Sequence, residues 1–459
     1  MSVTIDAILR GDVAEALKTA SSTPGARDLH GRTALYHAAE QGFMELVSTL
    51  LPFEARQQDN AGHTALMAAA RNGHLDCCKL LLAKEGKMVS RDKQTALMYA
   101  AGKGHTEVVK LLLPKEAKLR SSEGMTALML ATVGKHKDVV SLLVDKEGRM
   151  INEDGRTALM YAVIHRCDEL LDMLIKREAR TSAKNGITAL MLAVEANYTL
   201  AFEKLINLEI GRKATDGSTA LMRAAQNGRL EMAQRLIREL RIQRRDGMTA
   251  LMFATRKDNI QLVRLLIGEA GLATRDGQTA LMYAAMDGHI DCVQQLIALE
   301  VGRRTSDGYS ALIYATMNGQ HDAAALLVQE AGMKTSFGKT ALMMAALNDD
   351  ASLIGLLMKR ESGLQDEDGM TALMYAASYG RLSACARLAK TEAGMQNNDG
   401  VSALMLAAIE GYRDIALLLV ERERELCDHE GNTAVFYAEE NGCTEVLQLL
   451  AATAGEHPQ

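Results

Sequence analysis

The sequence contains no tryptophan, six phenylalanines and only four prolines among 459 residues. Its hydrophobic content of 48 % therefore comes mainly from Ala, Leu, Met, Ile and Val, which must build the interior. Charged residues make up 24 %, and the net charge of -6 is small for this length. Such a weak overall field favours solubility and argues against a chain devoted to nucleic acid or to an anionic membrane.

Long apolar runs and paired cysteines are missing as well. No stretch approaches the roughly 18 consecutive apolar residues of a membrane span, and the start, MSVTIDAILRGDVAEAL, lacks a basic segment followed by an apolar one. The seven cysteines are odd in number and form no CxxC pair: Cys77, Cys78, Cys167, Cys292, Cys385, Cys427 and Cys443. This pattern predicts reduced, mostly buried thiols in a cytoplasmic protein without membrane insertion, rather than disulfides or a zinc site.

What the chain does contain is one segment repeated from end to end, typified by residues 276–300, DGQTALMYAAMDGHIDCVQQLIALE. The hydroxyl residue of its TAL triplet recurs with ten spacings of 31 residues and three of 30, at Thr33, Thr64, Thr95, Thr126, Thr157, Thr188, Thr219, Thr249, Thr279, Ser310, Thr340, Thr371, Ser402 and Thr433. This period is typical of stacked repeats, in which no unit can bury its apolar face alone.

Each unit predicts a tight turn followed by two helices. Gly lies two residues before the hydroxyl in thirteen units, with Lys93 as the exception, and supplies the positive φ of a turn. The hydroxyl then caps the first helix. Nine units end that helix with Gly, and the others have Lys135, Arg166, Asn197, Asp258 or Asp349. Only Asn and Asp tolerate left-handed backbone well, so repeats near 126–197 are expected to fray most.

A glutamate lies ten residues before the hydroxyl of every unit after the first: Glu54, Glu85, Glu116, Glu147, Glu178, Glu209, Glu239, Glu269, Glu300, Glu330, Glu361, Glu392 and Glu423. At the end of the second helix a carboxylate opposes the helix dipole. We therefore expect each to have a structural partner, such as a turn amide or a neighbouring basic side chain. The alternative is an acidic ladder that binds a ligand.

The turn, the TAL entry, the Ala-Ala pair, the Gly-His step and the Val and Leu stripe resemble ankyrin repeats over residues 30–451. Met at the fourth entry position in eleven units, from Met67 to Met405, is similar to the short-repeat ankyrin proteins of Giardia known as protein 21.1. The units are about two residues shorter than the usual 33. Their entry lacks Pro and His, so Met must fill the gap by packing.

This resemblance implies an all-α solenoid of helix-turn-helix units joined by short hairpin loops. We expect an N-terminal capping half-repeat in residues 1–29 and an array of fourteen repeats in residues 30–451, the last of them capping. A disordered tail is expected in residues 452–459.

No candidate active site interrupts the repeat register. Gly102-Lys103-Gly104 joins two helices instead of following a strand, as a phosphate loop would, and His165-Arg166-Cys167 lacks the Asp of a kinase catalytic loop. The histidines mostly follow the repeat phase and have no Cys or carboxylate at metal-ligand spacing. We therefore predict no catalytic residue, cofactor, metal or small-molecule substrate.

One candidate binding surface is a column of tyrosines four residues after the hydroxyl: Tyr99, Tyr161, Tyr283, Tyr314, Tyr375 and Tyr437. In an ankyrin-like stack this column belongs to the inner helix near the concave side, where a hydroxyl could meet a partner. We favour the alternative, half-buried packing between neighbouring helices. Tyr283, Tyr314 and Tyr375 are nonetheless the candidates for partner contact.

The second candidate is a central basic cluster, residues 223–264, with ten basic residues against four acidic ones. Its candidate binding residues are Arg223, Arg244, Arg245, Arg256 and Lys257. They could grip an acidic peptide, a phosphorylated segment, tubulin-like acidic tails or nucleic acid. Nucleic acid ranks last because no aromatic residues are interleaved for stacking. A solvated outer face is equally compatible, since Arg235 and Arg238 lie on the second helix.

The function predicted from these features is a non-enzymatic, protein-binding scaffold or adaptor that uses the concave surface of the solenoid. The alternative is a regulatory binder of acidic or phosphorylated segments through the central basic cluster. A self-associating structural protein is a third possibility. We expect the cytoplasm as its location, with a cytoskeletal association as a further expectation. The sequence does not identify the partner.

Overall fold

The chain begins with two short helices, α1 (Val3–Arg10) and α2 (Val13–Thr19), joined at Gly11 with a φ of 80°. They lie in the expected capping half-repeat. The structure is a computed structural model that describes residues 3–20 and 24–452. Two compact units divide the chain, Met1–Arg223 and Ala224–Gln459.

Every repeat then supplies a first and a second helix, as predicted. The first helices are α3 (Ala34–Gln41), α5 (Ala65–Asn72), α7 (Ala96–Lys103), α9 (Ala127–Val133), α11 (Ala158–Ile164), α13 (Ala189–Glu195), α15 (Ala220–Gln226), α17 (Ala250–Arg256), α19 (Ala280–Asp287), α21 (Ala311–Met317), α23 (Ala341–Leu347), α25 (Ala372–Ser378), α27 (Ala403–Glu410) and α29 (Ala434–Glu440).

The second helices are α4 (Met44–Glu54), α6 (Leu75–Glu85), α8 (Thr106–Glu116), α10 (Lys137–Glu147), α12 (Leu171–Glu178), α14 (Thr199–Glu209), α16 (Leu230–Arg235), α18 (Ile260–Leu266), α20 (Ile290–Glu300), α22 (His321–Leu326), α24 (Ala351–Glu361), α26 (Leu382–Glu392), α28 (Arg413–Glu423) and α30 (Thr444–Ala452). Single 3-10 turns extend four of them: η1 (Asp168–Leu170) precedes α12, and η2 (Ile237–Glu239), η3 (Ile267–Glu269) and η4 (Val328–Glu330) follow α16, α18 and α22.

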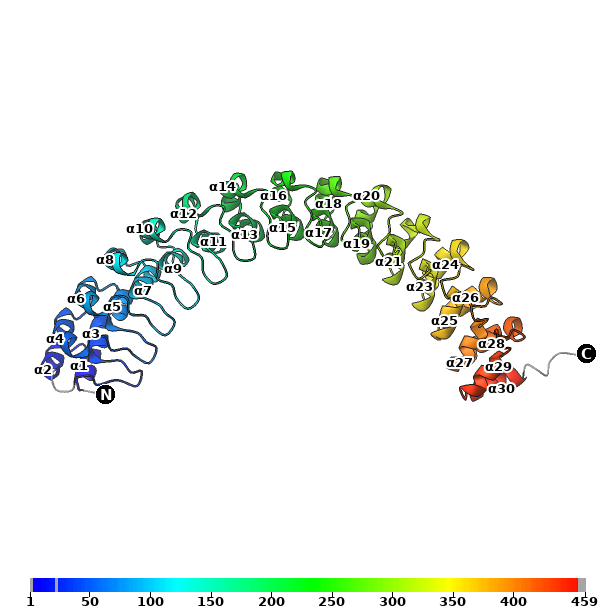
Figure 1. The fold of residues 1–459 in the computed structure, drawn as a ribbon, viewed down its shortest axis with the longest axis horizontal. Coiled ribbons are helices and arrows are strands. Elements are labelled where there is room, and N and C mark those ends of the chain that lie inside the picture. The colour runs from blue at the N-terminus through cyan, green and yellow to red at the C-terminus, as the bar shows by residue number, and fades with distance from the viewer. Residues whose placement is uncertain (1–2, 21–23, 453–459) are drawn as a thin grey trace, which may run out of the picture. The chain divides into compact units, whose positions relative to one another are not determined.

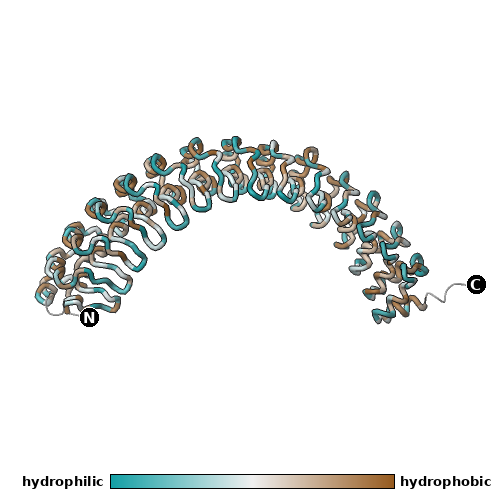
Figure 2. The backbone as a smooth tube through the Cα atoms, in the orientation of Figure 1, coloured by the Kyte–Doolittle hydropathy of each residue, from teal (hydrophilic) through white to brown (hydrophobic). Residues whose placement is uncertain are grey.

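Within each unit the helices form two layers. In the first unit, α3 to α13 pack side by side as one layer and α4 to α14 form the other; α17 to α29 and α18 to α30 do the same in the second (Figure 1). The first helices approach closely because Ala lies at their contact positions: Ala65 is 3 % exposed, and Ala69 and Ala70 are fully buried. Figure 2 shows hydrophilic turns between the hydrophobic helical segments.

Hydroxyl residues begin the first helices as predicted. Thr64, for example, accepts a hydrogen bond from the amide of Met67, at 3.3 Å, and is fully buried. A cap of this kind contributes about 1 kcal/mol. The following methionine packs inside, with Met67 2 % exposed. In some repeats the sulfur of this methionine also accepts a hydrogen bond. Met343 Sδ, for example, accepts from the amide of Thr340 at 3.4 Å.

Left-handed residues end the first helices. Gly42, Gly73 and Gly104 have φ values of 80–81°. The residues that replace Gly have the same left-handed backbone, with φ between 48° and 61° at Lys135, Arg166, Asn197, Asp258 and Asp349. The expected fraying near residues 126–197 stays a prediction. In that region the first helices α9, α11 and α13 have seven residues each, which is the same length as α21 outside it.

A one-bond ladder connects the hairpins of successive repeats. In most repeats the residue four before the hydroxyl donates its amide to the preceding hairpin: Arg91 N to the Ala61 carbonyl at 2.9 Å, and Ser306 N to the Asp276 carbonyl at 2.8 Å. No strand forms in residues 3–20 and 24–452, where the hairpins contribute isolated bridges at Arg27↔Thr33, Ser182↔Thr188, Gln396↔Ser402 and Cys427↔Thr433. The structure is all-helical, as predicted.

The glutamate column holds the repeats together from inside. Oε1 of Glu147 accepts from the amide of Lys118 in the turn of the preceding repeat at 3.0 Å, and Oε2 accepts from Leu128 in the first turn of α9 at 2.8 Å. The same pair of bonds forms at Glu54, Glu85, Glu116, Glu178, Glu209, Glu269, Glu300, Glu330, Glu361, Glu392 and Glu423. Glu239, 1 % exposed, completes the column. The expected structural partner, a turn amide, is confirmed. A ligand-binding acidic ladder is wrong, because the carboxylates are at most 3 % exposed.

Buried carboxyls give stability a predicted pH dependence. Burial, partly offset by amide bonds from Leu128 and Lys118, raises the pKa of Glu147 above its ordinary 4.5, and burial likewise raises the pKa of Glu85, Glu116, Glu178, Glu269, Glu361 and Glu423. A carboxyl of raised pKa keeps a proton in the folded state that the unfolded chain has lost. Folding is therefore favoured as the pH falls from neutral toward about 4.5.

The pKa of several aspartates shifts in the other direction, as at Asp28, Asp59, Asp246 and Asp428. The hydrogen bond from Arg244 lowers the pKa of Asp246, and the bond from Tyr437 lowers the pKa of Asp428 to about 2. The stability that the ionised carboxylates of Asp246 and Asp428 contribute is lost as the pH falls below the ordinary aspartate pKa of 3.8. The thermal unfolding midpoint should thus rise between pH 7 and about pH 4.5 and fall below about pH 3.8. A midpoint that declines steadily from pH 7 would contradict this.

At the C-terminus α30 extends to Ala452, the first residue of the expected tail. The rest of that tail, residues 453–459, lies outside the described residues. Among the residues that are described, no helix is both long and apolar enough to cross a membrane.

Candidate functional site

The tyrosine column is half-buried, and turn side chains engage its hydroxyls. Tyr375 donates to Asp366 Oδ2 at 2.6 Å, Tyr283 donates to Gln278 Oε1 at 2.7 Å, and Tyr314 accepts from Gln278 Nε2 at 3.2 Å. Burial raises the pKa of Tyr283 and Tyr375, which therefore remain protonated at neutral pH. These contacts favour the packing interpretation over a row of hydroxyls reserved for a partner. The use of the three tyrosines in binding stays a prediction.

The candidate residues of the central basic cluster are divided between the two units. Arg223 is the last residue of the first unit and forms an ion pair with Glu195. Arg244, Arg245, Arg256 and Lys257 belong to the second unit. They are therefore not shown to form one surface with Arg223.

In the second unit two of these cations lie over aromatic rings. The guanidinium of Arg244 pairs with Asp246 and lies 5.3 Å from the ring centre of Phe253. Arg256 lies 5.6 Å from the ring centre of Tyr283, so one predicted cation and one predicted tyrosine do come together. Arg245 is exposed in the hairpin, and Lys257 is exposed at the end of α17. Binding by these residues stays a prediction.

The histidines connect neighbouring repeats. Nε2 of His74 lies 3.0 Å from the Glu40 carbonyl, and Nε2 of His105 lies 2.9 Å from the Arg71 carbonyl, in each case at the end of the preceding first helix. In the part of the chain that the structure describes, no group of three or more His, Cys, Asp or Glu could hold a metal ion.

All seven cysteines are free thiols, and five are buried. Burial raises the pKa of Cys78, Cys292 and Cys385 to about 12. These thiols are therefore not nucleophilic thiolates at neutral pH.

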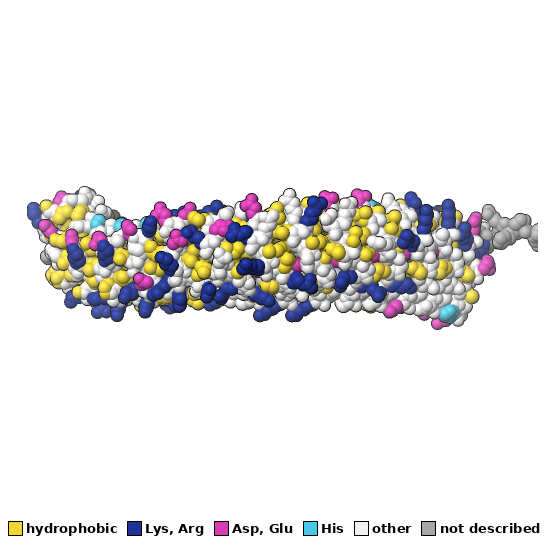
Figure 3. Space-filling view, turned by 90° about the horizontal axis from the view of Figure 1, so that it is seen from above, with side chains coloured by type: hydrophobic (Ala, Val, Ile, Leu, Met, Phe, Trp, Pro, Cys, Tyr) yellow, Lys and Arg dark blue, Asp and Glu magenta, His cyan; other side chains and the backbone are white. Residues whose placement is uncertain are grey.

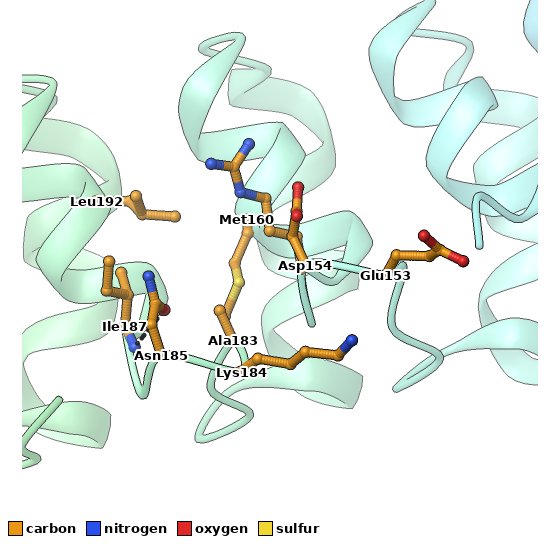
Figure 4. A pocket seen from close by; sticks show the side chains of 9 residues that line it. Glu153, Asp154, Met160, Ala183, Lys184, Asn185, Ile187 and Leu192 are labelled. Carbon is orange, nitrogen blue, oxygen red and sulfur yellow. Dashed lines mark hydrogen bonds between the residues drawn. The ribbon is translucent and has the colours of Figure 1, made fainter. Parts of the chain in front are cut away.

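A pocket of about 350 Å³ opens between the hairpins of the repeats that begin at Thr157 and Thr188 (Figure 4). Its apolar part consists of Met160, Ala183, Ile187 and Leu192, and its polar rim of Glu153, Asp154, Arg156, Lys184 and Asn185. In Figure 4, Met160 and Leu192 extend from their helices toward the space between the hairpins. The volume is at the lower end of the range typical of ligand pockets.

At this space the repeat has two smaller side chains than the repeat before it. One repeat earlier, Asn152 donates its Nδ2 to the hydroxyl of Tyr161 at 3.0 Å, so hairpin and helix are joined by large polar side chains. The corresponding residues are Ala183 and Leu192. Because Ala183 has no side-chain acceptor for the turn, Asn185 Oδ1 accepts the Ile187 amide instead, at 3.2 Å. The hairpin keeps its turn while the space above it stays open.

Our sequence predictions did not include this pocket. The signal was present in the repeat alignment, as Ala where most units have Asp, Asn, Ser or Thr five residues before the hydroxyl. The next unit has Ala214 at the same position, so an Ala in this column does not by itself distinguish a cavity from a tighter contact. Only the position of the neighbouring hairpin decides between them.

Comparison with known protein families gives a match to ankyrin repeats, described as "Ankyrin repeats (3 copies)", over residues 5–92, 86–153, 147–211, 190–275, 268–336, 329–394 and 385–459. None of the curated proteins compared with the chain matches it. The matched segments cover nearly all of the sequence and coincide with the paired helices and hairpins described above. The chain therefore belongs to the ankyrin-repeat family.

Proposed function

We propose that the protein is a non-enzymatic scaffold or adaptor in the cytoplasm that binds protein partners through its hairpins and first helices. Ankyrin repeats are generally modules for protein-protein interaction. The free cysteines support a reducing compartment. The Met-containing entry supports the narrower resemblance to the short-repeat Giardia proteins.

The observation that carries this proposal is the pocket at Ala183 and Leu192. The apolar part of this recess, Met160, Ala183, Ile187 and Leu192, suits one large apolar side chain of a partner, since buried anchors in well-packed pockets dominate binding energy. The rim offers both signs of charge, with Lys184 and Arg156 beside Glu153 and Asp154. These charges would set the orientation of the bound segment more than its affinity.

Filling the pocket should weaken partner binding. The double substitution Ala183→Asn/Leu192→Tyr restores the pair found at Asn152 and Tyr161 and is compatible with the fold of the preceding repeat. We expect captured partners to bind at least about ten-fold more weakly, which corresponds to loss of one anchor of about 1.4 kcal/mol or more. The measurement is quantitative affinity capture from source-cell lysate, followed by titration of the captured protein.

The matched control is Ser121→Asn/Leu130→Tyr, which places the same pair two repeats earlier, away from the pocket. It should bind as the unaltered protein does. Equal binding by both double variants would overturn the role of the pocket.

The second candidate function is regulatory binding of acidic or phosphorylated segments through Arg244, Arg245, Arg256 and Lys257. The observation that favours this function is that the guanidinium groups of Arg244 and Arg256 lie over aromatic rings. Arg245→Glu/Arg256→Glu/Lys257→Glu should then remove partners that high salt also releases. Partners that survive both treatments would contradict this second function.

A further inference from the structure

A second feature lies in the turns that follow the second helices of the first unit. Two residues after each glutamate of the column, five consecutive repeats of the first unit carry an exposed cation: Arg56, Lys87, Lys118, Arg149 and Arg180. We refer to these five as the basic row. Their spacing is 31 residues throughout.

Each residue of the basic row has left-handed backbone, with φ between 68° and 72°. This conformation costs free energy for any residue with a Cβ. The second unit shows what the position requires, because the corresponding residues there include Gly271, Gly302, Gly332, Gly363 and Gly394, with φ between 79° and 93°. Glycine would therefore satisfy the turn. Retention of a long cation in five successive repeats, despite the strain, points to a use for the charge.

The glutamate column fixes the geometry of the row. The amides of Arg56, Lys87 and Lys118 each donate to Oε1 of the buried glutamate in the following repeat at 3.0 Å, and those of Arg149 and Arg180 do so at 3.2 and 2.9 Å. Successive cations are thus held one repeat apart, about 10 Å, the spacing of packed helices. The result is a linear array of positive charge at constant pitch.

Other cations widen the array. Lys84, Lys115, Lys146 and Arg177, one residue before the column glutamates, are exposed as well. In the N-terminal part of Figure 3, Lys and Arg side chains gather along one edge of the face, and Asp and Glu are more frequent along the opposite edge. Asp145 lies 3.7 Å from Arg177 and offsets part of this charge.

The side chains of the row are available to a ligand. Arg149 and Arg180 each donate Nε to a carbonyl of the next repeat's second helix, those of Arg177 and Leu208, which leaves other guanidinium N–H groups to bind. Across residues 3–20 and 24–452, no carboxylate forms an ion pair with the five side chains. Their charge is therefore not neutralised within the described chain.

We propose that the basic row binds an extended acidic segment of a partner polypeptide with Asp or Glu at about every third residue. An extended chain advances about 3.3 Å per residue, so every third side chain meets the next cation of the row. The flanking positions hold Lys and Arg rather than aromatic residues, so the row lacks the stacking surface of a single-stranded nucleic-acid site. This proposal is independent of the hairpin pocket.

The test uses a synthetic peptide of about 18 residues with Glu at every third position, among Gly and Ser, and the full-length protein. A peptide of the same composition with its Glu residues in one block measures the importance of spacing. Fluorescence anisotropy at low and high salt gives both affinities. The regularly spaced peptide should bind at least several-fold more tightly than the block peptide, and high salt should weaken binding.

The decisive variant replaces all five row residues by Gly: Arg56→Gly, Lys87→Gly, Lys118→Gly, Arg149→Gly and Arg180→Gly. Glycine fits the left-handed turn, so this variant should be at least as heat-stable as the unaltered protein while losing ten-fold or more in peptide affinity. The charge-matched control is Lys18→Gln, Lys79→Gln, Lys103→Gln, Lys110→Gln and Lys137→Gln, which should lose no more than about two-fold.

Equal losses in the two variants would overturn the proposal, since binding would then depend on net charge alone. Tighter binding to an RNA oligonucleotide or to vesicles with anionic lipid than to the peptide would overturn the choice of partner. The Ala183→Asn/Leu192→Tyr variant should bind the peptide unchanged, which separates this result from that of the pocket.

Discussion

Replacing Glu147 by Gln should destabilise the protein by about 3 kcal/mol, although the two side chains have nearly the same shape. Glu147 is 1 % exposed and accepts from two backbone amides, those of Lys118 and Leu128. Glutamine offers one oxygen and one NH₂ group, so one buried amide loses its acceptor and faces another donor. The two amides belong to successive repeats, so the loss falls on the contact between them.

The measurement is urea unfolding followed by circular dichroism. Glu107→Gln is the matched control, because Glu107 is on the neighbouring helix α8, has a side chain 64 % exposed and pairs with Lys110 in an exposed ion pair. It should cost less than about 0.5 kcal/mol. If Glu147→Gln were as mild as Glu107→Gln, the column would be a consequence of packing and not a cause of it.

Gly338→Ala should also cost about 3 kcal/mol. Gly338 has a φ of 77°, and a Cβ there would lie 2.6 Å from the Glu367 amide nitrogen and 2.8 Å from the Asp366 Cα. That amide donates to the Phe337 carbonyl in the ladder between hairpins. The substitution therefore adds a displaced hairpin and a weakened ladder bond to the strain of the left-handed residue.

Gly302→Ala separates the two effects. Gly302 has a φ of 81°, but a Cβ there meets nothing within 4 Å. Its replacement should cost only the left-handed penalty, about 1 kcal/mol. Similar losses for Gly338→Ala and Gly302→Ala, in the same unfolding assay, would show that the hairpin ladder contributes little.

The turn, the helix cap and the helix end of each repeat could be predicted from the sequence, because each of them depends on one type of residue in one backbone conformation. A hydroxyl such as Thr64 has a simple role as helix cap, and Gly73 has a simple role as a left-handed helix end. Asn197 and Lys135 adopt the same left-handed backbone as Gly73, so the register of the repeat outweighs the preference of the individual residue.

Local rules could not predict where the column glutamates bind or where the pocket opens. Both depend on a neighbouring repeat, whose backbone the sequence does not place: Glu147 reaches the Lys118 amide 29 residues earlier, and the pocket at Ala183 and Leu192 is also lined by residues of the preceding hairpin. The Tyr column was ambiguous for the same reason. Its hydroxyls are engaged by turn residues such as Asp366 and Gln278, whose distance no periodicity reveals.

The most direct test of the proposed function is hydrogen-deuterium exchange of the full-length protein with and without a captured partner. Binding at the pocket predicts slower exchange in the hairpins of residues 152–156 and 183–187 and in α11 and α13. The Ala183→Asn/Leu192→Tyr variant should lose that protection. Protection confined to the second helices and the turns that follow them, with none in these hairpins, would contradict the account.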